Sequence, residues 1–209
     1  MTHKRIKNFR RSQGLIESII AISILVTAIV ALMAMSISAG NARLTNEYAT
    51  VAADLAREGI EVVVAKRNDN WMNDLAFDDG MYTGTDYTFA LAFNPATSVW
   101  SFVNNPAGGA PNAIGDALAK VYKYTANGLM AQGTVAVPQP AGTVATPYSR
   151  LVTLDPICYD GATETTVTSG SSCTGSNIKI GVRITSTVQW LDKGISHNIS
   201  AIETIYDWR

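Results

Sequence analysis

The fold is decided by an apolar run near the start of the chain, SIIAISILVTAIVALMAMSISA, which occupies residues 18–39. The run holds 22 residues and no charge. As an α-helix it would be about 33 Å long at about 1.5 Å per residue, which matches the hydrocarbon thickness of a bilayer. The sequence therefore predicts a helix that spans a membrane.

The residues before this run have a strong charge bias. Residues 1–12, MTHKRIKNFRRS, contain five Lys or Arg and no acidic residue. Because basic flanks stay on the cytoplasmic side of a membrane, we expect a cytoplasmic N-terminus and an exported chain after Gly40. The whole chain has 16 basic and 17 acidic residues, so the part after this leader holds 11 basic and 17 acidic residues, a net charge of −6. The total charge does not indicate a basic nucleic-acid-binding domain, so no nucleic-acid partner is predicted.

One acidic residue, Glu17, stands directly before the apolar run. A carboxylate at this position is costly to insert into a membrane, and such groups usually have a partner and a function. The N-terminus can be a cleaved secretory signal peptide, a plain membrane anchor, or a segment with a function of its own. A signal peptide has an apolar core of about 7–15 residues, whereas this run is longer and continues into a helical pattern.

Residues 11–22, RSQGLIESIIAI, resemble the prepilin motif of type IV pilins and pseudopilins. That motif is a basic leader, a cleavage point, four residues and then a Glu that opens a long apolar helix. The resemblance implies cleavage between Ser12 and Gln13, N-methylation of Gln13, and Glu17 as the fifth residue of the mature chain. The family usually has Gly directly before the cut, where this chain has Ser12. Cleavage after Gly14 is the alternative, but it would make Glu17 the third residue, which departs from the motif, so the cut between Ser12 and Gln13 is favoured.

The resemblance also implies partners and a localisation. A prepilin peptidase would remove the leader, membrane lipid would surround the helix before assembly, and an inner-membrane assembly platform would add the subunit to a filament. Other pilin subunits would pack side by side through residues 18–39. In the family's assembly scheme Glu17 pairs with the N-terminal amine of a neighbouring subunit, and because an unpaired buried charge is costly, this pair would set the register. The protein would lie in the cytoplasmic membrane and, after assembly, in a pilus at the cell surface.

Helical periodicity persists beyond Gly40, although the composition becomes polar. One apolar stripe recurs at helical spacings: Leu44, Tyr48, Val51, Leu55 and Val62. We therefore predict one extended helix from about residue 13 to about residue 67, with an amphipathic second half. Residues 55–71, LAREGIEVVVAKRNDNW, also resemble a segment common in minor-pilin-like proteins. The Asn-Asp-Asn at 68–70 predicts the end of the helix, with Trp71 as an aromatic anchor at the junction with the head.

From about residue 72 the pattern changes to short strands separated by turns rich in Gly, Pro and Asn. Strand candidates lie at residues 87–93, 99–103, 120–130 and 148–154, and loops are predicted at 104–111 and 135–147. The clearest signal comes last. Apolar and polar residues alternate from Ile178 to Trp190, a turn follows at 192–194, and residues 195–208 return as a second strand. The second half of this returning strand is apolar on both faces, which predicts cover on both sides.

These features together predict an α+β fold, with a long N-terminal helix packed on an antiparallel β-sheet head in a pilin-like arrangement. The predicted divisions are a basic leader peptide at 1–12, a transmembrane or filament-core half-helix at 13–40, an amphipathic stalk helix at 41–71 and a β-rich head at 72–209. Cys158 and Cys173 are the two cysteines of the chain and bracket a loop rich in Thr, Ser and Gly. Because both would be exported to a compartment in which disulfides persist, we predict a bond between them.

No catalytic constellation is apparent in the sequence. His3 lies in the leader and His197 stands by itself in a predicted strand, and there is no phosphate loop, dinucleotide fingerprint or Ser-His-Asp spacing. We expect no enzyme, no metal site and no cofactor. The leading hypothesis is a structural subunit of a type IV pilus or related machine, a minor pilin in particular. The alternatives are a single-pass membrane-anchored extracellular binding domain that does not polymerise, and a secreted domain released by cleavage beyond about residue 35.

Overall fold

The computed structural model describes the backbone of residues 6–81, 87–104, 113–168 and 173–207, and side chains from Gly14 onward. The architecture is α+β, as predicted, with one long helix and one eight-stranded sheet among these residues. Helix α1 runs from Ile6 to Met72. It begins before and ends after the predicted 13–67, because Asn68, Asp69 and Asn70 do not stop it.

The chain is divided into two compact units, residues 1–47 and residues 48–209. The first unit contains the predicted membrane helix. Its apolar side chains are solvent-exposed along the whole run, for example Ile24 at 65% and Leu32 at 66% exposure. This helix is long and apolar enough to cross a membrane. The second unit contains the rest of α1 and the whole sheet.

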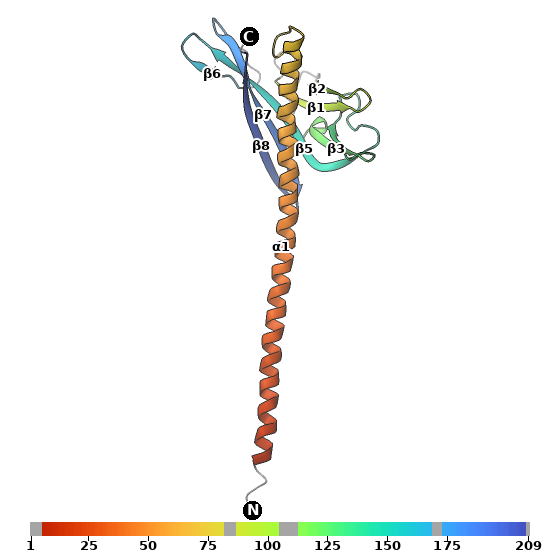
Figure 1. Cartoon of the computed structure of the whole chain (residues 1–209), viewed down its shortest axis with the longest axis vertical. Helices are drawn as coiled ribbons and strands as arrows, with labels where there is room; N and C mark the ends of the chain where they lie inside the picture. The colour runs from red at the N-terminus through yellow and green to blue at the C-terminus, as the bar shows by residue number, and fades with distance from the viewer. Residues whose placement is uncertain (1–5, 82–86, 105–112, 169–172, 208–209) are drawn as a thin grey trace, which may run out of the picture. The chain divides into compact units, whose positions relative to one another are not determined.

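The sheet has the order β2-β1-β4-β3-β5-β7-β8, with β6 paired to β5 and a further pairing of β1 with β5 (Figure 1). The strand pairings among the described residues are antiparallel except one parallel bridge between Ala92 of β1 and Gln132 of β4. A short 3-10 helix, η1 (Ala117–Ala119), precedes β3. The strand bounds are β1 Thr88–Asn94, β2 Val99–Val103, β3 Lys120–Tyr124, β4 Met130–Gln132, β5 Thr143–Tyr159, β6 Glu164–Thr166, β7 Ile178–Asp192 and β8 Ile195–Tyr206.

Two strand predictions were wrong in extent. The candidate at 120–130 is two strands, β3 and β4, because Gly128 takes a positive φ of 76° and turns the chain between them. Strand β5 begins at Thr143, inside the stretch predicted to be a loop at 135–147, since Thr143 and its neighbours pair with β3. Pairing with a distant strand therefore overrides the local preference of a proline-containing segment for a loop.

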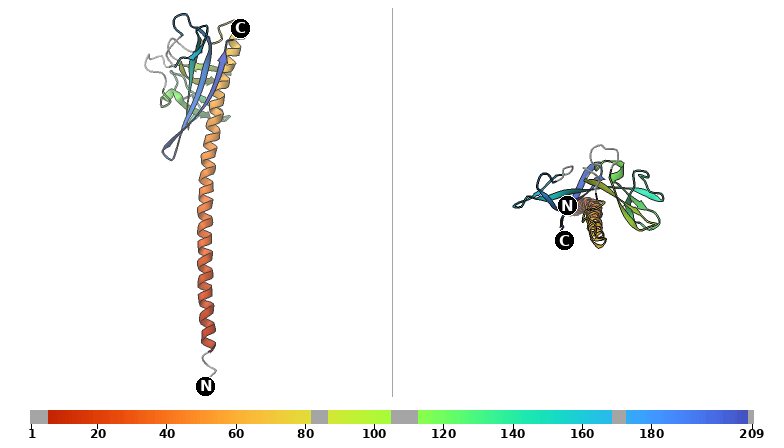
Figure 2. Two further views of the ribbon diagram at one scale, coloured as in Figure 1. Left: turned by 90° about the vertical axis from the view of Figure 1, so that its left-hand side faces the viewer. Right: turned by 90° about the horizontal axis from the view of Figure 1, so that it is seen from above.

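Residues 48–72 of α1 lie on one face of the sheet (Figure 2), as the amphipathic pattern predicts. Leu55 and Val62 of the predicted stripe are buried, whereas Tyr48 and Val51 are half-buried and Leu44 is 52% exposed. The side chains that pack against the strands include several that the stripe omitted: Ala52, Ala56, Ile60 and Val63. The buried face therefore includes the small residues Ala52 and Ala56 beside larger aliphatic side chains.

Helix α1 approaches the sheet closely at Gly59. A Cβ atom added to Gly59 would collide with the Ser186 hydroxyl and would lie 3.1 Å from Ser186 Cβ and 3.3 Å from Val152 Cγ2. Gly59 costs helix propensity, as its position in the middle of α1 predicts. The packing against β7 and β5 explains why a residue without a side chain stands there.

The C-terminal hairpin confirms the strongest strand prediction. β7 pairs with β8 residue by residue from Gly181–Tyr206 to Asp192–Ile195, and the turn lies at Lys193–Gly194 as expected. On the helix-facing side Val182, Ile184 and Val188 are fully buried. The prediction of cover on both faces of β8 was wrong, because Ile202 is 64% exposed on the face of β8 that points away from α1.

Candidate functional site

Glu17 is the one charged residue between Ser12 and Ala42, and it lies on the apolar part of α1. Its neighbours on the helix surface are Ile16, Ile20, Ala21 and Ile24, all aliphatic. The structure thus presents a carboxylate within an apolar surface that no other described part of the chain covers.

Three hydroxyl groups of the apolar run, those of Ser18, Ser23 and Thr27, form hydrogen bonds with the helix backbone. They donate to carbonyl oxygens one turn earlier: Ser18 to Gly14 at 2.8 Å, Ser23 to Ile19 at 2.8 Å and Thr27 to Ile24 at 2.8 Å. These bonds leave the three hydroxyls with no need of water, as a helix in an apolar medium requires. A carboxylate has no backbone donor within reach in a helix interior, so Glu17 needs a cation from outside the chain if it enters such a medium.

For Ser12 and Gln13, the other residues of the predicted processing site, the structure describes only the backbone. Helix α1 continues through Ser12 and Gln13, but their side chains lie outside the described residues. Cleavage, methylation and the choice between the bonds after Ser12 and after Gly14 stay predictions.

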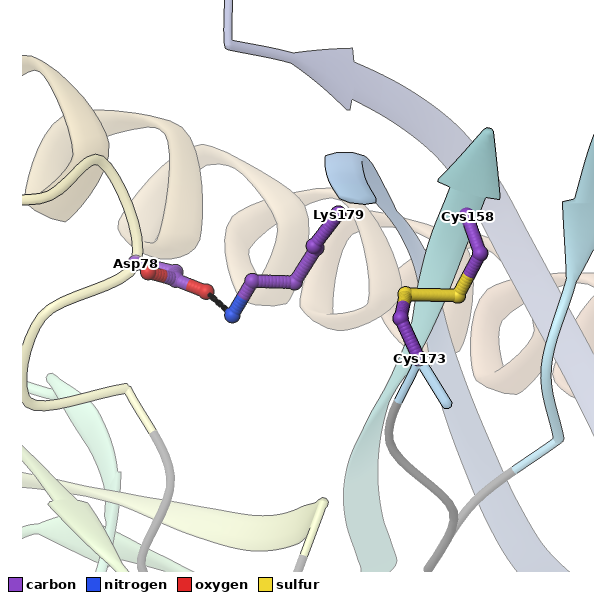
Figure 3. Close-up of a disulfide and its surroundings, with 4 residues drawn as sticks. All are labelled: Asp78, Cys158, Cys173 and Lys179. Atoms are coloured by element: carbon purple, nitrogen blue, oxygen red, sulfur yellow. Dashed lines mark hydrogen bonds and ion pairs between the residues drawn. A yellow bond between two sulfur atoms is a disulfide. The ribbon is translucent and has the colours of Figure 1, made fainter. Parts of the chain in front are cut away.

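The predicted disulfide is present: Cys158 of β5 is bonded to Cys173, with Cα atoms 5.6 Å apart. The bond ties the end of β5 to the segment that leads into β7, and β6 lies inside the loop it closes (Figure 3). Close by, Lys179 at the start of β7 forms an ion pair with Asp78, from the segment after α1. The Lys179 ammonium also lies 5.8 Å from the centre of the Phe77 ring. This region therefore fixes the end of α1 to the sheet.

Tyr87, at the entry to β1, is buried in the same core cluster as Phe77. Burial raises the pKa of the Tyr87 hydroxyl above its usual value, and the charge of Asp78 adds to the effect. Burial and the neighbouring Asp78 carboxylate therefore both disfavour a negative charge on the Tyr87 phenol oxygen.

A buried polar cluster that sequence patterns did not reveal joins the helix to the sheet. The Arg150 side chain of β5 is completely buried. Its Nη1 donates to Glu58 Oε2 of α1 at 2.8 Å and to the Leu55 carbonyl at 3.3 Å, and its Nε donates to Gln132 Oε1 at 3.1 Å. Burial lowers the pKa of Arg150, and the Glu58 carboxylate counteracts that effect.

Gln132 extends this cluster to the other strands. Its amide nitrogen donates to the carbonyls of Leu118, Ala119 and Arg150, and its oxygen accepts from the backbone N–H of Leu91 at 3.0 Å. One amide therefore links β4 to β1, β5 and η1. The arrangement is structural: it holds α1 against a sheet whose strands are far apart in sequence. The sequence around Glu58 and around Arg150 gives no local signal that these two residues pair, because they are 92 residues apart.

No group of acidic, His and Cys side chains that could hold a metal ion occurs in the described ranges. His197 of β8 stacks on Trp190 with ring centres 5.5 Å apart. It therefore packs beside an aromatic ring in the hairpin.

Comparison of the chain with protein-family models, with curated proteins and with solved structures finds no match.

Proposed function

We propose that this protein is a pilin-like structural subunit, anchored in a membrane by α1 and assembled into a filament through the apolar part of that helix. A minor subunit of a type IV pilus or of a related secretion machine fits the resemblance of residues 11–22 best. The observation that carries the proposal is the single carboxylate of Glu17 on an otherwise uncharged and uncovered helical surface. Such a surface is covered by lipid before assembly and by the same helix of other subunits afterwards.

Processing precedes assembly in this scheme. The prepilin peptidase cuts between Ser12 and Gln13 and removes the five basic residues that hold the precursor in its orientation. The new amine of Gln13 is then available to the Glu17 carboxylate of a neighbouring subunit. In an apolar environment this pair is directional, so it fixes the axial register between helices. The disulfide-closed head remains outside the filament core.

The test compares filament incorporation of Glu17→Ala with that of Glu47→Ala, which removes an exposed carboxylate beyond the apolar run. We expect Glu17→Ala to abolish recovery of the protein in sheared surface filaments while membrane insertion continues, and Glu47→Ala to be recovered normally. N-terminal sequencing of the recovered protein reports the cleavage site. Normal incorporation of the Glu17→Ala variant would refute the proposed role of this residue.

The alternative function is a membrane-anchored extracellular binding domain that does not polymerise. It requires residues 1–12 to stay attached in cells that contain the peptidase. A mature N-terminus at Gln13, dependent on the peptidase, would exclude it.

A further inference from the structure

A cavity opens in the head where strands β1 and β4 separate. The two strands share one parallel bridge, between Ala92 and Gln132. Both continue in the same direction past this bridge, but β1 turns into the hairpin with β2, whereas the chain after β4 leaves the sheet as a loop. The space between them has a volume of about 380 Å³, which is within the range of small-ligand sites. The whole cavity lies within the second compact unit.

One wall of the cavity is the loop after β4, which hydrogen bonds hold in place. Thr134 and Val137 exchange two backbone hydrogen bonds, at 3.0 and 3.1 Å. The carbonyl of Gly142 accepts from both the backbone N–H and the hydroxyl of Thr125, each at 3.0 Å. A Cβ atom on Gly133 would collide with the Val137 carbonyl, so the loop packs directly on the end of β4. This wall is therefore formed before any ligand binds.

The other wall is the hairpin of β1 and β2. The rings of Phe93 and Trp100 pack with their centres 4.9 Å apart and join the two strands. The Asn94 Oδ1 accepts from the backbone N–H of Ala96 at 3.0 Å, which fixes the start of the turn. Gln132 also lines the cavity, and its amide is already bonded to β1, β5 and η1. A preformed cavity favours binding, because little order has to be gained when the ligand enters.

The chemistry of the lining selects the kind of ligand. It combines apolar residues with uncharged polar ones, and no charged side chain of the described residues lines the cavity. Phe93 and Tyr124 are its aromatic residues, and its exposed polar residues are Asn94, Ser101 and Thr134. A charged group in this cavity would lack a counter-ion, which is costly away from water. The lining therefore suits a neutral ligand that has both an apolar face and hydrogen-bonding groups.

We propose that this cavity binds a sugar unit of a neutral glycan. A pyranose ring has an apolar C–H face, which packs against Tyr124, and a rim of hydroxyl groups, which form hydrogen bonds with Asn94 and Ser101. A purely apolar ligand would leave these polar side chains without partners. A proline-rich peptide docks in an extended aromatic-lined groove, whereas this cavity is compact. Binding requires neither processing of the N-terminus nor assembly, so it goes beyond the proposed function.

The test uses the full chain in phosphatidylcholine nanodiscs, because detergents with sugar headgroups would compete for the cavity. Saturation-transfer difference NMR is recorded with neutral probes that differ in their sugar: maltotriose, cellotriose, mannotriose, galactobiose and tri-N-acetylchitotriose. Trigalacturonate is the charged probe, and decaproline is the peptide probe. Titration of each probe that receives saturation gives its dissociation constant.

Two variants change the cavity and one serves as the control. Tyr124→Ala removes an aromatic residue of the lining, and Ser101→Trp fills the cavity from an exposed position of β2 and keeps the other lining residues. Tyr206→Ala is the matched control, since it removes a tyrosine that is 39% exposed on β8, a strand that does not line the cavity. Circular dichroism checks that each variant is folded, and Ser101→Trp decides the outcome if Tyr124→Ala is not.

We expect saturation transfer to a neutral sugar, binding weakened by about tenfold in Tyr124→Ala, binding lost in Ser101→Trp and binding unchanged in Tyr206→Ala. Absence of transfer to every neutral sugar, or retained binding in Ser101→Trp, would overturn the proposed site. Tighter binding of trigalacturonate would contradict the argument from the uncharged lining, and binding of decaproline in place of the sugars would assign the cavity to a peptide. Each of these results leaves the filament proposal intact, because Glu17→Ala tests that proposal separately.

Discussion

The ion pair between Arg150 and Glu58 makes an asymmetric prediction about the stability of the head. The Arg150 side chain has no exposed surface, whereas that of Glu58 is 34% exposed. Removing the carboxylate leaves a guanidinium sealed in the core, and its Nη2 already lacks a hydrogen-bond partner in the described structure. Removing the guanidinium leaves a carboxylate that can turn to water. The two substitutions therefore break the same bond with different consequences.

We expect Glu58→Ala to lower the free energy of unfolding by about 3–5 kcal/mol, the range found when a buried charge loses its partner. Arg150→Met, which fills similar space with an apolar side chain, should cost about 1–2 kcal/mol, mainly for lost hydrogen bonds. Gln132 Oε1 keeps its bond to the Leu91 N–H in that variant. The double variant should be no less stable than Arg150→Met, since no unpaired charge remains buried.

The assay is guanidinium chloride unfolding of the full chain in detergent micelles, followed by tryptophan fluorescence. All four tryptophans lie between residues 71 and 208, so the signal reports the head alone. Trp100 lies 5.9 Å from the Arg150 guanidinium and adds a local probe. An Arg150→Met variant that is less stable than Glu58→Ala would refute the argument from burial.

Three further predictions use the same unfolding assay. Gly59→Ala should lower the free energy of unfolding by about 1–2 kcal/mol, because overpacking against β7 outweighs the gain in helix propensity. Adding Ser186→Gly to this variant should recover most of the loss. A Gly59→Ala variant that is more stable than the natural chain would contradict the close packing at this position. Because burial raises the pKa of Tyr87, the hydroxyl loses its proton at a lower pH in the unfolded chain than in the folded protein. The free energy of unfolding should therefore fall as pH rises above about 10. In Tyr87→Phe the unfolding midpoint should decrease less with rising pH. Replacing Cys158 and Cys173 with serine should cost about 3 kcal/mol for a loop of 15 residues, and an unchanged unfolding midpoint would contradict this prediction.

Several elements could be predicted because their signals are local and regular. The uncharged run of 22 residues, the alternation from Ile178 to Trp190 and the turn at Lys193–Gly194 each repeat a period or a turn chemistry within a short window. The disulfide could also be predicted, because two cysteines allow a single intramolecular pairing and the chain was predicted to be exported. The position of Glu17 is also visible in the sequence, since a lone charge in an apolar run needs no tertiary context to be noticed.

Predictions failed where a distant partner decides the local structure. Thr143 belongs to β5 because β3 pairs with it, and Ile202 is exposed because no described element covers this face of β8. The helix extends past Asn68 and Asn70, and the Asn70 amide donates to the carbonyls of Phe77 and Asp79 after the helix has ended. A helix-breaking composition is a weak preference that such contacts override.

By itself the sequence determined that this protein has an apolar helix fit to cross a membrane, an amphipathic continuation, and a β-rich head closed by a disulfide. Only the tertiary structure decided how helix and head are joined: through the charge of Arg150 buried against Glu58, 92 residues away, and through the space that Gly59 leaves for Ser186. The physical reason is that periodicity and turn chemistry are properties of neighbouring residues. Close packing and the pairing of buried charges, in contrast, depend on which distant segments the fold brings into contact.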